Sequence, residues 1–294
     1  MTTTPDTTTP AATGTVPATG AVPALEGRGL TLSYESRQIS RDLDVSVPAG
    51  EVTVIIGPNA CGKSTLLRAL SRLLTPDSGD VLLSGRDVRR MAPKALARRL
   101  GLLPQSSTAP FGITVADLVA RGRFPHQRML QQWSEADRVA VARAMEATRI
   151  TALADRMVEE LSGGQRQRVW IAMLLAQDTP VMLLDEPTTF LDISHQLEVM
   201  ELVHRLNREE GRTVALVLHD LNQACRYADH LIVMHGGRIV DRGAPREVMT
   251  EELLAQVFAL EARVIDDPVC GTPMVVPLRS LGDPGEAATA GDPA

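Results

Sequence analysis

The sequence contains almost no lysine. Of its 30 basic residues only Lys63 and Lys94 are lysine, and 36 acidic residues give a net charge of -6 over 294 residues. A protein whose main partner is nucleic acid usually carries a basic footprint, so we expect no nucleic-acid partner. Because arginine fills nearly every basic position, a lysine that is present indicates a need for a compact ammonium charge.

Long apolar runs are also missing. No stretch approaches the ~18 consecutive apolar residues of a membrane-spanning helix. The N-terminus lacks the basic and apolar segments of a secretory signal. With 44% hydrophobic and 22% charged residues, the composition is typical of a soluble protein. We therefore expect the chain to act inside the cell and to reach a membrane only through a partner.

Cysteine is scarce and scattered. Cys61, Cys225 and Cys270 are far apart and show no CxxC spacing. This pattern predicts neither a disulfide framework nor a zinc site, and reduced thiols fit a cytosolic protein.

The two ends differ in composition from the rest of the chain. Residues 1–24 are mostly Thr, Pro, Ala and Gly, and residues 282–294 are similar. Neither segment has a period that could bury one face, so we predict two disordered tails. Folded sequence is expected between residues 25 and 281.

Within the folded part, β-rich runs alternate with helical patterns. Runs at 52–56, 181–184 and 214–218 are followed by helical sequence from Lys63, Ile193 and Leu221. This alternation predicts a parallel α/β sheet. The apolar residues Ile193, Leu197, Met200, Val203 and Leu206 recur at helical spacing, and we expect this face to pack in the core.

Two stretches interrupt the alternation. Residues 30–34 and 43–47 read as antiparallel edge strands, whereas residues 114–148 are mostly helical. We therefore expect an α/β core that carries a β-subdomain and a helical insert.

A phosphate-binding loop follows the first predicted core strand. The segment matches G-x-x-x-x-G-K-[ST] and opens a helix, which is the context this motif requires. Its glycines let backbone N–H groups turn toward phosphates, Lys63 adds a charge for the β and γ phosphates, and the Ser64 hydroxyl can ligate Mg²⁺. The alternative is a glycine-rich turn. The loop comprises Gly57, Pro58, Asn59, Ala60, Cys61, Gly62, Lys63 and Ser64.

Cys61 lies in this loop beside Lys63, at the start of a helix. Both features favour a thiolate, so the sequence predicts an unusually reactive cysteine.

The run from Val181 to Pro187 is an apolar strand that ends in two carboxylates, Asp185 and Glu186. Open α/β sheets place their ligand chemistry at such strand ends. Asp185 can hold the Mg²⁺ shell, and Glu186 can orient and deprotonate an attacking water. Taken alone, these acids could equally cap a helix.

The segment from Leu161 to Arg168 has two interpretations. Ser162 and Gln165 have the S-x-x-Q spacing of a capping box that starts a helix. Gly163 and Gly164 also expose N–H groups at the helix N-terminus, where a second phosphate could bind. The motif alone favours capping.

With these motifs in order, the chain resembles the ABC ATPases. Leu161 to Gln165 is similar to their signature motif, and the resemblance covers roughly residues 25–258. It implies a P-loop ABC ATPase fold with a mostly parallel core sheet, an antiparallel β-subdomain, a helical insert at about 106–178 and a C-terminal extension at 259–281. ATP and Mg²⁺ are the implied cofactors.

The resemblance also implies roles for single residues. Tyr34 resembles the adenine-stacking aromatic, and His219 the switch histidine that contacts the γ-phosphate. Gln105 resembles the glutamine that senses nucleotide and touches the transmembrane partner, and it is also expected at the metal site. Leu191 and Asp192 resemble the D-loop, and Thr65 belongs to the nucleotide-binding set. The alternatives are that Tyr34 is an aromatic of an edge strand, Gln105 a polar group of a loop and His219 a helix cap. Many relatives have glycine at the position of Ala60. Whether the loop tolerates alanine there depends on the backbone angles at that position.

In the family, chains pair head to tail, so that Lys63 of one and Ser162 of the other would flank each nucleotide. One full motif set implies a homodimer. The resemblance further implies transmembrane permease subunits as partners, a substrate-binding protein as an indirect partner, and a peripheral location on the cytoplasmic face of the membrane.

Two further stretches indicate a lineage. Residues 121–126 and 266–273 resemble the ATPase subunits of ferric-siderophore importers, with haem and vitamin B12 systems as near relatives. A soluble ABC ATPase of DNA repair or translation is the alternative. Such proteins carry long coiled-coil inserts or two ATPase units, whereas here Ser162 follows Gln105 by only 57 positions. A P-loop kinase or GTPase would lack the signature and His219.

Overall fold

The structure is a computed structural model that describes residues 22–34, 37–127, 133–189 and 191–282. The predicted tails lie outside these ranges except for residues 22–24 and Gly282. Ala24 is buried, and its N–H donates to the carbonyl of Val47 over 3.0 Å. The folded part therefore includes Ala24, which the composition of the sequence places in the tail.

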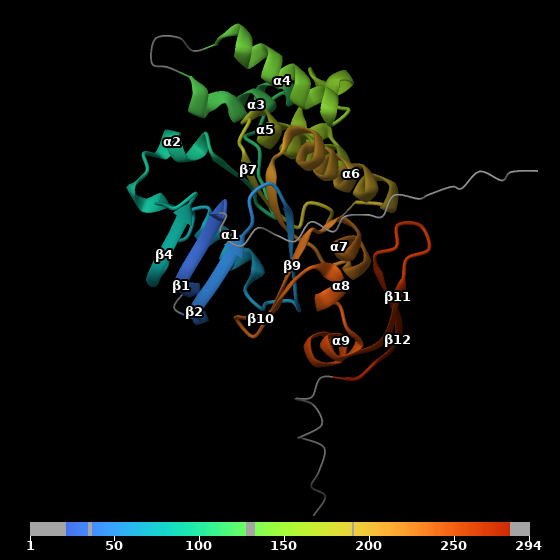
Figure 1. Cartoon of the computed structure of the whole chain (residues 1–294). Helices are drawn as coiled ribbons and strands as arrows, with labels where there is room; N and C mark the ends of the chain where they lie inside the picture. Colours follow the sequence, from blue (N-terminus) through green and yellow to red (C-terminus); the bar gives the residue numbers. More distant parts are fainter. Residues whose placement is uncertain (1–21, 35–36, 128–132, 190, 283–294) are drawn as a thin grey trace, which may run out of the picture.

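A six-stranded sheet forms the centre of the molecule (Figure 1). Its order is β10-β9-β3-β8-β7-β6, in which β10 pairs antiparallel with β9 and the other pairs are parallel. The predicted parallel α/β sheet is confirmed. The strands are β3 (Val52–Ile56), β6 (Leu100–Leu103), β7 (Val181–Asp185), β8 (Thr213–Val217), β9 (His230–His235) and β10 (Arg238–Gly243).

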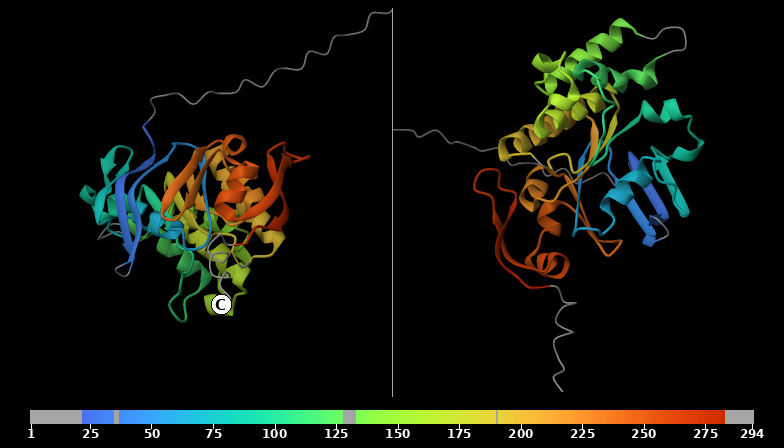
Figure 2. Two further views of the ribbon diagram at one scale, coloured as in Figure 1. Left: turned by 90° about the horizontal axis from the view of Figure 1, so that it is seen from below. Right: turned by 180° about the vertical axis from the view of Figure 1, so that it is seen from behind.

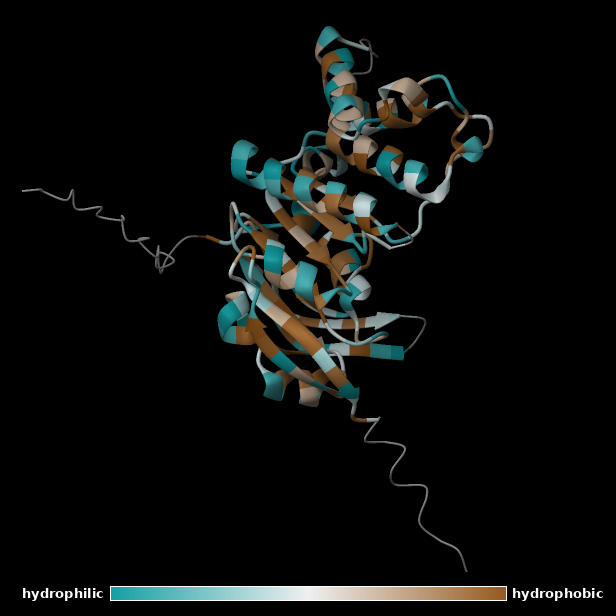
Figure 3. Cartoon of the chain, turned by 90° about the vertical axis from the view of Figure 1, so that its right-hand side faces the viewer, coloured by the Kyte–Doolittle hydropathy of each residue, from teal (hydrophilic) through white to brown (hydrophobic). Residues whose placement is uncertain are grey.

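The central strands are buried on both faces, which explains their almost uninterrupted aliphatic sequence. In β3, Val54 and Ile56 point into one hydrophobic cluster and Ile55 into the other. Figure 3 shows these strands in brown between helices whose outer residues are teal. The sheet therefore separates two cores.

One core lies against helix α1 (Lys63–Leu70) and a four-stranded antiparallel sheet of order β2-β1-β4-β5. The predicted antiparallel edge strands lie in this four-stranded sheet, which is separate from the central sheet. The strands are β1 (Leu25–Tyr34), β2 (Arg37–Val47), β4 (Ser78–Leu83) and β5 (Arg86–Asp87); α2 (Pro93–Ala97) follows them in the chain.

The other core is covered by helices. They are α3 (Val115–Ala120), α4 (Glu135–Ala147), α5 (Gly163–Ala176), α6 (Ile193–Glu210) and α7 (Leu221–Tyr227). Figures 1 and 2 show α3 and α4 at one end of the molecule. This agrees with the helical character predicted for residues 114–148, while the domain boundaries stay a prediction.

Side-chain caps set the starts of these helices. Ser134 and Asp137 form a capping box on α4, and Asp192 and Asp220 accept from backbone N–H groups at the starts of α6 and α7. These caps satisfy donors that the first turn leaves free.

The predicted core face of α6 is correct for three of its five residues. Met200, Val203 and Leu206 are buried, but Ile193 is 76% and Leu197 36% exposed. The packed part of the helix starts at Val199, because its first turns project beyond the core. Periodicity shows which face is apolar, and it does not show what covers that face.

The chain ends in α8 (Pro245–Val248), α9 (Glu251–Phe258) and a hairpin of β11 (Leu260–Asp266) and β12 (Pro273–Ser280). Asn222 of α7 exchanges two hydrogen bonds with the backbone of Val275 and fixes the hairpin to the core. In the part of the chain that the structure describes, no helix is long and apolar enough to span a membrane.

Candidate nucleotide-binding site

A cleft of about 640 Å³ opens at the carboxyl ends of the parallel strands. The loop after β3, Gln105 after β6, Glu186 after β7 and His219 after β8 all reach it. Open α/β sheets bind ligands at this edge. The lining residues are Tyr34, Arg37, Ile39, Asn59, Ala60, Cys61, Gly62, Lys63, Ser64, Thr65, Gln105, Glu186, Thr189 and His219.

The phosphate-type loop is fixed by close backbone packing. Gly57 has φ +153°, and a Cβ there would stand 2.1 Å from the carbonyl oxygen of Met234. Only glycine fits at this position. Lys63 is buried, and its Nζ donates to the carbonyls of Gly57 and Pro58 over 2.8 and 2.9 Å. The ammonium is thus held beside the N-terminus of α1.

Ala60 adopts φ +60°, in the left-handed region. The sequence left open whether the backbone would permit alanine here. It does, at a steric cost of roughly 1–2 kcal/mol compared with the right-handed region. Ala60 therefore occupies a conformation that glycine would adopt without this cost.

Ser64 and Asp185 provide neighbouring oxygen ligands. Ser64 Oγ donates to Asp185 Oδ1 over 2.9 Å, and Asp185 is 1% exposed. Burial raises the pKa of Asp185, and the neighbouring carboxylate of Glu186 raises it further, although the Ser64 hydrogen bond opposes this shift. Mg²⁺ prefers hard oxygen ligands, and the Ser64 hydroxyl and the Asp185 carboxylate supply two of them. A positive charge nearby would also stabilise the ionised form of the buried carboxyl.

Glu186 is the centre of a hydrogen-bonded cluster. Its carboxylate accepts from Gln105 Nε2 over 2.7 Å and from Thr189 Oγ1 over 3.1 Å, and it lies 2.7 Å from His219 Nε2. Burial by itself raises the pKa of Glu186. The hydrogen bonds from His219, Thr189 and Gln105, together with the charge of His219, outweigh burial and lower it. Glu186 is therefore ionised at neutral pH and can accept a proton.

The backbone of Glu186 is strained, with φ +53° in a residue other than glycine. Such conformations concentrate at functional sites, where surrounding contacts hold them.

Tyr34 lies at the rim of the cleft and is 45% exposed. The Arg68 guanidinium is 5.9 Å from its ring centroid. Sequence reasoning missed Arg37, Ile39 and Thr189 as lining residues. Arg37 and Ile39 are two positions apart in one strand and so share a face, and this spacing could have indicated that they lie together.

The signature segment does not reach this cleft. Ser162 and Gln165 form the predicted capping box on α5, with hydrogen bonds of 3.3 and 3.2 Å. Neither they nor Gly163 and Gly164 line the cleft of their own chain. Within one chain the signature segment and the cleft are thus separate, and the hydrogen bonds of the segment are those of a helix cap.

The prediction of a reactive Cys61 is wrong. The side chain is buried, and burial raises the pKa of its thiol, with Lys63 giving only a weaker opposing effect. Cys225 is also buried, which raises its pKa to about 12, whereas Cys270 is exposed. The sequence showed the neighbouring charge but not the burial.

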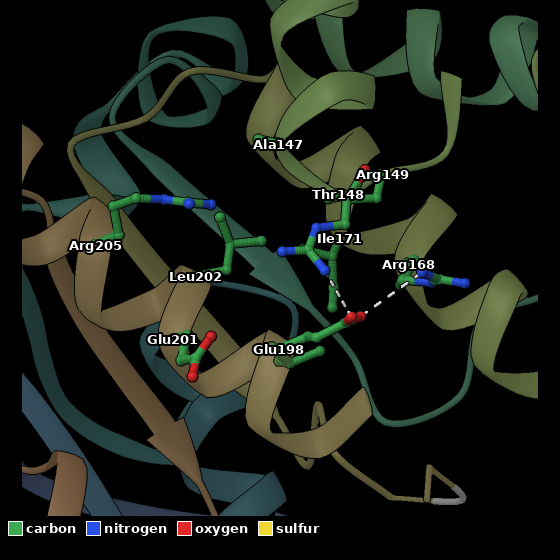
Figure 4. A pocket seen from close by; sticks show the side chains of 10 residues that line it. Ala147, Thr148, Arg149, Arg168, Ile171, Glu198, Glu201, Leu202 and Arg205 are labelled. Atoms are coloured by element: carbon green, nitrogen blue, oxygen red, sulfur yellow. Dashed lines mark hydrogen bonds and ion pairs between the residues drawn. The ribbon is translucent and has the colours of Figure 1, made fainter. Parts of the chain in front are cut away.

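A second hollow lies between α4, α5 and α6 (Figure 4). It measures only about 40 Å³, and Glu198 pairs across it with Arg149 at 2.8 Å and Arg168 at 3.7 Å. Because this hollow is far smaller than the cleft, the cleft is the candidate site.

Comparison with known proteins identifies the class. The family model described as "ABC transporter" matches residues 40–189. The chain is 58% identical to the ferric enterobactin transport ATP-binding protein FepC of Escherichia coli K12, over 86% of this chain and 94% of that protein. It is 52% identical to the achromobactin transport ATP-binding protein CbrD of Dickeya dadantii, over 90% and 98%.

Solved structures agree with this result. One chain, described as belonging to a metal-chelate type ABC transporter in an inward-facing conformation, matches with TM-score 0.74 and 28% identity over 88% of this chain and 98% of that chain. A dimeric bacterial ABC transporter cassette matches with TM-score 0.68 and 26% identity, over 75% and 98%. The chain belongs to the ABC transporter family and has the ABC ATPase fold.

Proposed function

We propose that this chain is the ATP-binding and hydrolysing subunit of an ABC importer that takes up an iron-siderophore complex through a separate membrane permease. The observation that carries the ATPase part is the convergence of Lys63, Ser64, Asp185, Glu186 and His219 on one cleft. The relatives described as ferric enterobactin and achromobactin transport proteins support the cargo.

In this proposal the residues divide the chemistry. Tyr34 stacks on adenine, and the loop from Gly57 to Thr65 wraps the phosphates. Lys63 exchanges its carbonyl partners for phosphate oxygens. Mg²⁺, held by Ser64, Asp185 and Gln105, would neutralise charge on the β and γ phosphates.

Glu186 acts as the general base. It is ionised, and its side chain is already aimed by Gln105 and His219, so it can take a proton from the attacking water. His219 contacts the γ-phosphate in this scheme and loosens its contact with Glu186 when nucleotide binds.

A homodimer completes the site. Ser162, Gly163, Gly164 and Gln165 lie outside the cleft of their own chain, so any nucleotide that they contact would be bound to a partner. A dimeric structure in the same family supports this arrangement. Ile193, apolar and 76% exposed beside the D-loop residue Asp192, supports an interface here. The permease subunits at the cytoplasmic face and an indirect substrate-binding protein belong to the same proposal.

Two experiments test the proposal. Co-purification should recover a membrane permease with the chain. Deletion of the gene should abolish uptake of a ⁵⁵Fe-labelled siderophore and impair growth under iron restriction, and a plasmid copy should restore both. Normal iron uptake with loss of another nutrient would overturn the cargo, while purification without any permease would overturn the transporter role.

A further inference from the structure

Gln167 connects the signature helix to the catalytic carboxylate within one chain. It lies on α5, five residues after Ser162, and its Nε2 donates to the carbonyl of Pro187 over 3.0 Å. Pro187 is buried and directly follows Glu186. The strained backbone of Glu186 needs contacts that hold it, and this hydrogen bond is one of them.

The start of the same helix also lies close to Leu191, which hydrogen bonds link to the segment after His219. A Cβ on Gly164 would stand 3.4 Å from Leu191 Cδ2, which is ordinary packing distance. The Leu191 carbonyl accepts from Gln196 Nε2 over 2.9 Å, and Gln196 Oε1 accepts from Gln223 Nε2 over 2.7 Å. Gln223 lies on α7, which begins two residues after His219. Helix α5 is therefore linked directly to the turn after Glu186, and indirectly to α7 through Gln196 and Gln223.

We infer that Gln167 is a positioning residue that couples the two nucleotide sites of the dimer. The inference rests on the proposed function, because in a head-to-tail dimer the α5 N-terminus faces the partner's nucleotide while Glu186 faces its own. Gln167 does not line the nucleotide cleft. It fixes the Glu186 turn relative to α5, so that a shift of α5 against the partner's nucleotide changes the placement of the base.

The first test replaces the donor. Gln167→Met keeps the length of the side chain but cannot donate to Pro187. We expect kcat to fall about five-fold or more, the lower end of coupling between sites, with KM for MgATP unchanged within about two-fold. Gln167→Lys, which retains a donor, should recover at least half of the activity.

Gln256→Met is the matched control, because Gln256 lies on the exposed face of α9, away from the cleft. Thermal midpoints of all variants separate a folding defect from a positioning defect. The inference would be overturned if Gln167→Met had the wild-type kcat, or if the control Gln256→Met lost as much kcat as Gln167→Met does.

The second test is a double-mutant cycle with Ser162→Ala, read on kcat. If the effect of Ser162 reaches Glu186 through Gln167, the double variant should lose about five-fold less activity than the product of the single losses. If the loss in the double variant equals the product of the two single losses within about two-fold, the two residues act independently and the coupling is refuted.

The two ideas fail in different ways. A wild-type chain that neither hydrolyses ATP nor forms an ATP-dependent dimer would refute the proposed function. Normal wild-type hydrolysis and dimerisation, together with an indifferent Gln167→Met, would refute only the coupling.

Discussion

His219 Nε2 lies 2.7 Å from Glu186 Oε1, although the two residues follow different strands of the sheet. Glu186 follows β7 and His219 follows β8, and these strands are parallel neighbours. The pairing therefore arises from strand order, and it holds the carboxylate of Glu186 in the cleft.

Glu186→Gln should keep the shape of this cluster but remove the base. Hydrolysis should fall ~10² to 10⁴-fold, the usual value of general-base assistance, while ATP affinity survives. The variant should accumulate as an ATP-bound dimer in sedimentation velocity. Adding Ser162→Arg should disperse that dimer by blocking the second anion site. A protein that binds ATP yet stays monomeric, even with its permease, would contradict the shared-site arrangement.

Lys63→Ala should weaken MgATP binding strongly. The lost charge-assisted hydrogen bonds are each worth about 1.5–3 kcal/mol, so the Kd should rise at least about ten-fold by calorimetry. Lys94→Ala is the matched control, because it removes the other lysine, which is exposed and lies outside the cleft. Equal affinities for the two variants would remove the main argument for the loop.

Thiol labelling should follow burial. We expect maleimide at pH 7.5 to modify the exposed Cys270 first, Cys61 slowly and Cys225 last, because burial raises the pKa of both buried thiols and limits access. MgATP should slow Cys61 further because that residue lines the cleft. Fast labelling of Cys61 in the Cys270→Ser variant would show that the loop is open in solution.

The buried pair Arg123 and Asp137 should be important for stability. Arg123 Nε donates to Asp137 Oδ1 over 2.8 Å, and both side chains are almost inaccessible. Arg123→Met leaves an unpaired buried carboxylate and should cost about 3–5 kcal/mol in urea unfolding. The exposed pair of Arg138 with Glu135 is the control, and Arg138→Met should cost at most ~1 kcal/mol. Equal costs would mean that burial does not matter here.

The same pair predicts a dependence on pH. Burial alone would raise the pKa of Asp137, but the hydrogen bonds from Arg123 and Ser134 outweigh it and lower the pKa to about 2. A lowered folded-state pKa gives stability that is fully present above the unfolded value of about 4 and is lost as the pH falls toward 2. Wild-type unfolding free energy should therefore drop across this window more steeply than that of Asp137→Asn.

Contiguous patterns determined much of this protein from the sequence alone. The loop from Gly57 to Ser64, the capping box of Ser162 and Gln165, and the buried strands depend on neighbours within a few residues, because backbone conformation and hydrogen bonding there are local. Strand and helix alternation was enough to predict the parallel sheet. The family follows from the order of the motifs.

Tertiary structure decided what depends on burial and on strand order. The expected reactivity of Cys61 is wrong because packing desolvates the thiol. Ile193 is exposed because none of the residues that the structure describes covers the start of α6. Gln105, Glu186 and His219 meet because parallel neighbours end at one edge. The contact of Gln167 with Pro187 joins residues 20 positions apart. No local pattern encodes such a contact, since it exists only when α5 packs beside the end of β7.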